Sequence, residues 1–77
     1  MHINARHRLA ILEALYQALE AHPRGGWTSE RELTRLFGDI AFAVAVLREL
    51  GHLQADGPKY RITGPGILAY EAACEAE

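Results

Sequence analysis

The chain has few of the features that mark specialised classes of protein. Its 77 residues contain one cysteine, few aromatic residues and no apolar stretch approaching the roughly 20 residues needed to cross a bilayer. No charged and apolar segments of a secretory signal peptide open the sequence. The single cysteine, Cys74, cannot form an internal disulfide. These absences predict a soluble cytoplasmic protein in a reducing environment.

The chain also lacks an excess of positive charge. Eight basic and ten acidic residues give a formal net charge of −2. Three glutamates lie beyond residue 70, so residues 1–70 carry eight basic and seven acidic groups, a net charge of +1. Dedicated nucleic-acid-binding domains are usually much more basic. The charge therefore argues mildly against DNA binding without excluding it.

The length allows one domain with a small core. A chain of this size buries about 60% of the surface that it exposes when unfolded. The sequence has no internal repeat, and 49% of its residues are hydrophobic, which is normal for a globular protein. We therefore expect residues 1–77 to form a single domain without room for a sizeable substrate cleft.

The first predicted helix covers residues 4–22. Apolar residues recur along it at spacings of three and four, which places them on one face: Leu9, Leu12, Leu15, Tyr16 and Leu19. Asn4 is expected to cap its start, and Pro23 with the glycines that follow to end it. Trp27 comes next, and we expect it to anchor a very short strand in the core.

Two short helices follow in close succession. The first opens with a capping box, in which Ser29 precedes Glu32 by three residues, and it ends at the next glycine. The second follows Asp39, which can cap it, and runs to about Leu50. A turn of four residues or fewer separates the two helices, which is typical of a helix-turn-helix.

Beyond Gly51 the apolar pattern changes from helical to alternating. Two short alternating runs flank Asp56 and Gly57, and an Asp-Gly pair is a strong signal for a hairpin turn. Thr63, followed by Pro65, then opens a last helix. The predicted order is helix, short strand, helix, helix, two-stranded hairpin, helix. This is an α+β fold that is mostly α.

Two segments carry a resemblance to winged-helix regulators. The segment 45–53, AVLRELGHL, resembles the end of their recognition helix, with Leu47 and Gly51 at the matching spacing. Leu50 departs from the pattern because it replaces a usual polar residue. The segment 60–66, YRITGPG, is similar to their second wing strand and the entry to their final helix. The resemblance implies a winged-helix fold and, by the habit of that family, a dimeric DNA-binding transcriptional regulator.

The third predicted helix lacks the polar side chains with which such regulators recognise bases. The apolar spacing turns one set of residues inward: Ile40, Val44, Leu47 and Leu50. The outward positions are then Ala41, Phe42, Ala45 and Arg48, flanked by Val46 and Glu49. From residue 40 to residue 47 no side chain can form a hydrogen bond with a base edge. Asp39 would also repel phosphates.

Two interpretations of this apolar surface remain open. In the first, a partner surface formed by four residues packs against a second copy or another protein: Ala41, Phe42, Ala45 and Val46. In the second, Phe42 folds under the hairpin or against the first helix, and the alanines are simply good helix formers.

Five cations are candidates for phosphate contacts in a DNA-binding relative: Arg31, Arg35, Arg48, Lys59 and Arg61. Arg31 and Arg35 lie one helical turn apart, so both can face one surface. The alternative is that Glu32 pairs with Arg35 and that the other cations only interact with solvent.

No pattern indicates catalysis or metal binding. The four histidines match no zinc spacing, and Ser29 is already explained by helix capping. We therefore expect neither an enzyme nor a cofactor, metal or small-molecule substrate. The function expected first is a winged-helix regulatory module that binds a second copy or a protein partner through its third helix, with DNA contacts mainly to phosphates. The alternative is the dimeric DNA-binding regulator.

Overall fold

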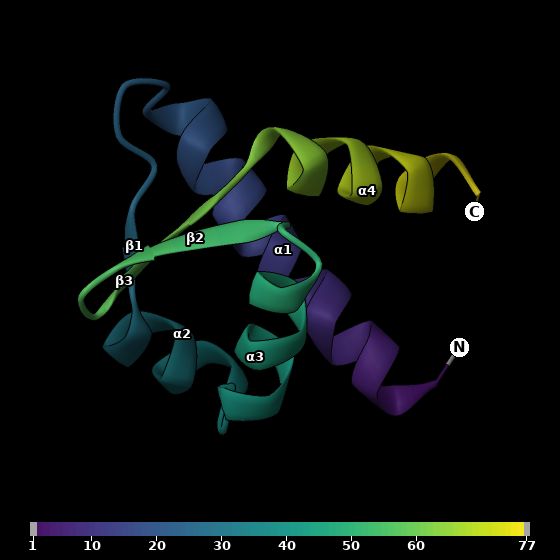
Figure 1. The fold of residues 1–77 in the computed structure, drawn as a ribbon, viewed down its shortest axis with the longest axis horizontal. Coiled ribbons are helices and arrows are strands. Elements are labelled where there is room, and N and C mark those ends of the chain that lie inside the picture. The colour runs from purple at the N-terminus through teal and green to yellow at the C-terminus, as the bar shows by residue number, and fades with distance from the viewer. Residues whose placement is uncertain (1, 77) are drawn as a thin grey trace.

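The computed structural model describes residues 2–76. Within these residues the chain forms four helices and three strands, whose order is α1 (Ile3–Ala21), β1 (Thr28–Ser29), α2 (Glu30–Phe37), α3 (Ala41–Glu49), β2 (Leu53–Asp56), β3 (Lys59–Ile62) and α4 (Gly64–Glu75) (Figure 1). The predicted order of elements and the mostly helical α+β class are confirmed. Across the same residues, no helix combines the length and apolar character needed to cross a membrane.

Helix α1 is the longest element and forms one wall of the core. It begins at Ile3, one residue before the predicted start, because His2 is its N-cap and the Nδ1 atom of His2 accepts a hydrogen bond from Asn4 N at 3.1 Å. The prediction that Asn4 caps the helix is therefore wrong. Its buried side chains come from the apolar stripe and its flank: Ile11, Leu12 and Leu15.

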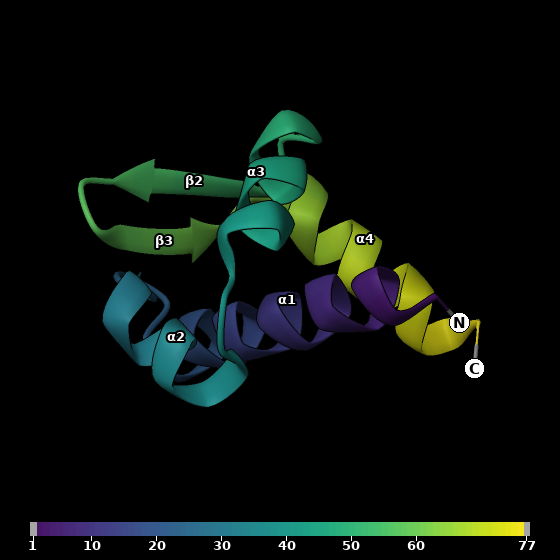
Figure 2. The same ribbon diagram turned by 90° about the horizontal axis from the view of Figure 1, so that it is seen from below.

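The three strands form an antiparallel sheet in the order β1-β3-β2. Asp56 pairs with Lys59, so Gly57 and Pro58 form a two-residue turn, and Gly57 adopts a φ of +60° at its first position. Such a turn suits glycine and matches the twist of the flanking strands. Figure 2 shows the hairpin beside α1 and α2, with its turn pointing away from the C-terminal end of α4.

The core lies between α1, α3 and the inner face of the sheet. Five of its side chains are essentially inaccessible to solvent: Ile11, Leu15, Leu33, Leu47 and Ile62. Burying an aliphatic side chain of this size contributes about 1.5–3 kcal/mol to folding. Because β3 alternates, Tyr60 and Ile62 face this core while Lys59 and Arg61 face the other side of the sheet.

Two glycines permit close approaches that fix the ends of the helices. A Cβ atom on Gly66 would collide with the carbonyl oxygen of His52 and lie 2.8 Å from Ile62 Cγ1. Gly26 has a φ of +77°, and a Cβ atom there would lie 2.8 Å from the Cα atom of Leu19. The start of α4 is therefore packed tightly on the base of the hairpin, and the loop before β1 lies on the last turns of α1.

Two residues expected in the core are exposed. Trp27 is 39% exposed; it lies one residue before β1, whose first residue, Thr28, pairs with Tyr60. Leu50 is 55% exposed although its backbone is still helical, with a φ of −77° and a ψ of −9°; it is the C-cap of α3, and the chain leaves the helical path at Gly51, whose φ is +76°. The core anchor at Trp27 and the inward position of Leu50 are therefore wrong predictions.

Candidate interaction surface on α3

The start of α3 is held by a backbone turn and one carboxylate. Gly38 ends α2 with a φ of +79°, and Asp39 Oδ1 accepts a hydrogen bond from Ala41 N at 3.0 Å. The N-cap position itself is Ile40, whose side chain makes no capping hydrogen bond. Asp39 thus supplies the predicted carboxylate, but from one residue before the N-cap.

The two sides of α3 differ sharply in their surroundings. Its inner side is buried against α1 and β2 through four residues: Ile40, Ala43, Val44 and Leu47. On the outer side Ala41, Ala45 and Arg48 are exposed, Phe42 is 61% exposed and Val46 is half-buried. The interpretation in which Phe42 folds into the core is therefore wrong. The predicted outward positions are confirmed.

We call the four residues Ala41, Phe42, Ala45 and Val46 the α3 surface. None of their side chains carries a hydrogen-bond donor or acceptor. Two small residues beside one phenyl ring allow another backbone to approach closely around an aromatic anchor. Leu36 at 52% exposure and Leu50 at 55% add apolar area in the segments before and after α3.

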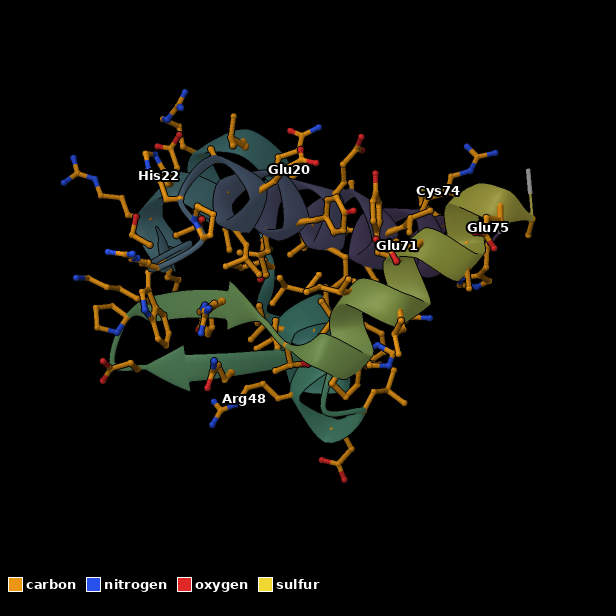
Figure 3. All side chains as sticks on the ribbon, turned by 90° about the horizontal axis from the view of Figure 1, so that it is seen from above. Glu20, His22, Arg48, Glu71, Cys74 and Glu75 are labelled. Carbon is orange, nitrogen blue, oxygen red and sulfur yellow. The ribbon has the colours of Figure 1, made fainter. Side chains whose placement is uncertain are left out.

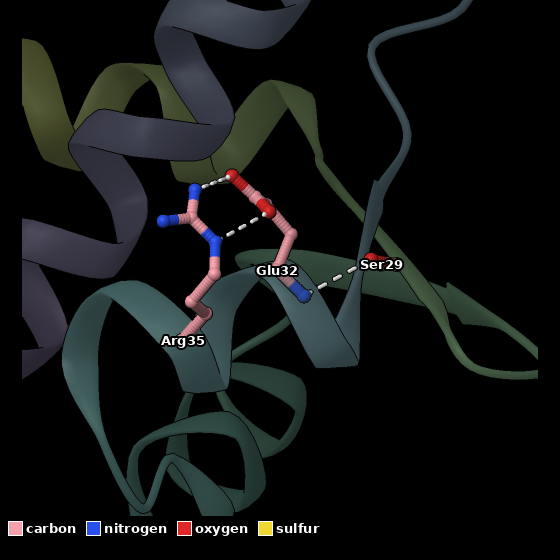
Figure 4. Close-up of polar contacts among 3 residues, drawn as sticks. All are labelled: Ser29, Glu32 and Arg35. Carbon is pink, nitrogen blue, oxygen red and sulfur yellow. Dashed lines mark hydrogen bonds and ion pairs between the residues drawn. The ribbon is translucent and has the colours of Figure 1, made fainter.

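One of the two cations on α2, Arg35, is less available than its spacing suggests. Arg35 forms a two-pronged ion pair with Glu32, in which Nε donates to Oε2 at 3.1 Å and Nη2 to Oε1 at 2.5 Å (Figure 4). Arg35 lowers the pKa of the Glu32 carboxyl, and Glu32 raises the pKa of Arg35. Ser29 Oγ accepts from Glu32 N at 3.1 Å, so half of the predicted capping box forms. The Glu32 side chain is used by Arg35 instead of the Ser29 backbone.

The other cations lie around the hairpin, away from the Arg35 pair. Lys59 and Arg61 share the outer face of β3, where their cross-strand neighbours are Asp56 and Gln54. Figure 3 shows Arg48 reaching from α3 towards β2. The Nε atom of Arg61 is buried without a hydrogen-bond partner, so part of this side chain is covered. The structure therefore separates the five predicted phosphate contacts into three near the hairpin and two on α2.

The titratable side chains elsewhere do not assemble into a reactive site. Among residues 2–76, no group of three or more His, Cys, Asp or Glu side chains could hold a metal ion. His7 Nε2 lies 3.2 Å from the Phe37 carbonyl oxygen and ties α1 to the end of α2. Cys74 is exposed on α4.

A groove between α1 and α4 was not predicted from the sequence. It has a volume of about 240 Å³ and is lined by Tyr16, Leu19, Glu20, Pro23 and Ile67. No local signal could have indicated it, because Ile67 is far from the other four residues along the chain. The Tyr16 hydroxyl donates to Glu71 Oε2 at 2.7 Å, which raises the pKa of Tyr16. The neighbouring Cys74 thiol raises the pKa of Tyr70 to about 12.

No family model matches the chain, and neither a curated protein nor a solved structure matches it.

Proposed function

We propose that the protein is a non-enzymatic winged-helix regulatory module that self-associates, or binds a protein partner, through the α3 surface. The order of elements supports this fold, because α2 and α3 are followed at once by a hairpin and a final helix. The sheet order supports it as well, since the short strand before α2 pairs with the second strand of the hairpin. In this interpretation α3 occupies the position of the recognition helix.

A single observation carries the proposal: the exposed side of α3 is hydrocarbon where a base-recognising helix would carry donors and acceptors. A helix that is apolar on all sides is normally covered on all sides. The core already covers Ala43, Val44 and Leu47, while Phe42 on the opposite side remains 61% exposed. A second protein surface that covers Phe42 would remove this apolar area from water.

The test is sedimentation of the purified protein over a range of concentrations. Phe42→Asp places a charge in the α3 surface, so we expect its association constant to fall at least tenfold, which corresponds to about 1.4 kcal/mol. Leu68→Asp is the matched control, because Leu68 is 69% exposed on α4 and lies outside the α3 surface. It should associate as the unaltered protein does.

Both variants should unfold at the same temperature as the parent protein, since neither residue is buried. Equal association of the parent protein and Phe42→Asp would contradict a contact between copies through α3. Unfolding of Phe42→Asp would also contradict the proposal, because it would mean that Phe42 stabilises the single molecule rather than a contact between copies.

One observation favours the second candidate, DNA binding through phosphates. Arg48, Lys59 and Arg61 lie around the hairpin, and cations at a wing can hold a duplex without base contacts. For this function, Arg48→Ala combined with Lys59→Ala should weaken binding to mixed-sequence duplex at about 50 mM salt and flatten its salt dependence. Arg31→Ala combined with Arg35→Ala is the matched control of equal charge. No binding by the parent protein at that salt would eliminate this candidate.

A further inference from the structure

The groove between α1 and α4 is an apolar hollow with fixed walls. Its volume of about 240 Å³ is several times the ~30 Å³ share of one water molecule in the liquid, so a branched side chain can enter it. The rings of Tyr16 and Tyr70 hold the two helices together, with centroids 4.7 Å apart. The close approach of Gly26 to Leu19 fixes the end of the groove next to the loop before β1.

The helices around the groove carry negative charge. Glu20 lines the groove itself. Residues 9–21 contain two glutamates and no Lys or Arg, and α4 contains Glu71 and Glu75 and likewise no Lys or Arg. Figure 3 shows Glu20 on α1 and Glu71 on α4, whereas Glu75 lies at the opposite end of α4 from the groove, and Arg48 lies on the far side of the hairpin. The nearest cation in the sequence is Arg24, which follows Pro23 at one end of the groove.

The first turns of α1 have the opposite character. Ile3 is 76% exposed, and Arg6, which is also exposed, lies one turn further along the same helix. Residues 2–12 include Arg6 and Arg8 and no Asp or Glu. The N-terminal end of a helix adds a partial positive charge of its own. This end therefore combines a protruding aliphatic side chain with a cationic surround.

From this complementarity we infer that the groove between α1 and α4 receives the start of α1 from a second copy of the chain, with Ile3 in the groove and Arg6 near Glu20. The contact cannot form within one molecule. Ile3 and Leu19 are 16 residues apart on one continuous helix, which separates them by about 24 Å. Each copy therefore has both a start to insert and a groove to be filled by other copies.

This contact differs in symmetry from a pairing of two α3 surfaces. The start of α1 and the groove are different surfaces, so each single contact is head-to-tail; it can be repeated along a chain of copies, or the same neighbour can return it and close a pair. A contact area confined to one side chain and its rim is small, so the association is weak and transient. Because opposite charges attract across it, added salt weakens it.

The experiment uses two variants that each disable one half of the contact. Ile3→Asp removes the apolar side chain from the start of α1, and Glu20→Lys reverses the charge in the groove. Both are made in a Phe42→Asp background, which removes any contribution of the α3 surface. Both altered residues are exposed, so circular dichroism spectra and unfolding temperatures should match those of the parent.

We expect each variant alone to sediment as a monomer at about 1 mM, where the Phe42→Asp parent associates. An equal mixture of the two should form a 1:1 dimer, because one supplies an intact start of α1 and the other an intact groove. Leu68→Asp in the same background should associate as the parent does. The mixed dimer should dissociate at high salt.

A mixture that stays monomeric would overturn the inference, as would undiminished association of Ile3→Asp alone. Both results are independent of the α3 proposal, which is tested by comparing the unaltered chain with Phe42→Asp. If Phe42→Asp changes nothing and the mixture still dimerises, the α3 proposal fails and the head-to-tail contact stands.

Discussion

Helices α2 and α3 are similar in length and position but differ in their exposed sides. Each is short, eight and nine residues respectively, and each buries one side against the rest of the molecule. The exposed side of α2 carries charged groups, among them the ion pair of Glu32 and Arg35. The exposed side of α3 carries two alanines and the phenyl ring of Phe42, and a charged side chain, Arg48, follows only in its last turn.

This difference shows that a short helix packed on one side in this fold does not need an apolar outer side. Helix α2 satisfies the same packing with a solvated outer face. Alanine favours helix formation by itself, but phenylalanine does not, so helix propensity does not explain residue 42. The proposed contact of α3 with a second protein surface would account for it.

The largest expected effect tests whether the inner sides of the two helices are equivalent. Leu33→Ala in α2 and Leu47→Ala in α3 each remove a fully buried side chain, so each should lower the free energy of unfolding by about 2–5 kcal/mol. For a domain of this size each kcal/mol lowers Tm by roughly 4–8 °C. Urea unfolding of each variant measures the loss in free energy, and thermal unfolding measures the fall in Tm. If only one of the two variants lowers the free energy of unfolding by less than about 1 kcal/mol, the inner sides of the two helices are not equivalent.

A smaller effect tests the different starts of the two helices. Ser29→Ala removes the side-chain acceptor for Glu32 N and should cost about 1 kcal/mol. Asp39→Ala removes an acceptor that lies one residue before the N-cap of α3, and its cost should be no larger. Urea unfolding measures both costs, provided that the slope of the unfolding free energy against urea concentration is the same for both variants. A clearly greater loss for Asp39→Ala would mean that α3 depends on its carboxylate more than α2 depends on its serine.

The smallest expected effect is a loss of folding stability in acid that comes from the ion pair on α2. Arg35 lowers the pKa of Glu32 in the folded protein, so the pair stabilises the fold above the unfolded pKa of a glutamate. This contribution is lost as the pH falls from about 4.3 through the lower folded pKa. Glu32→Gln should remove that part of the acid dependence. An identical pH profile of stability for Glu32→Gln and the parent protein would show that the pair contributes nothing in solution.

The sequence predicted the elements well because their ends depend on local signals. Glycines and capping side chains mark the ends of α2 and α3 and the start of α4; Gly38 and Gly51 adopt positive φ values after α2 and α3, and Gly57 does so in the hairpin turn. The outward positions of α3 were also predictable, since a helical period relates them to the buried residues. Trp27 and Leu50 were not, because each lies one residue outside a regular element, where periodicity no longer fixes direction.

The candidate surfaces were predictable only where a single element forms them. The α3 surface consists of neighbouring positions on one helix, so its composition is visible in the sequence. The cations around the hairpin depend on strand register, and the partner of Arg35 depends on which rotamer Glu32 adopts. The groove needs α1 and α4 to meet, and Ile67 is separated from Pro23 by most of the fold. Contacts of that kind follow from tertiary packing alone.

If another protein surface covers the exposed hydrocarbon of α3, contacts between copies should be detectable in solution. The most direct test follows the backbone amide NMR shifts of the unaltered protein as its concentration is raised. We expect the amide shifts of Ala41, Phe42, Ala45 and Val46 to change progressively with concentration, and we expect this change to be absent in Phe42→Asp. Constant shifts along α3 at every concentration, with an unchanged molecular mass, would contradict self-association through this helix.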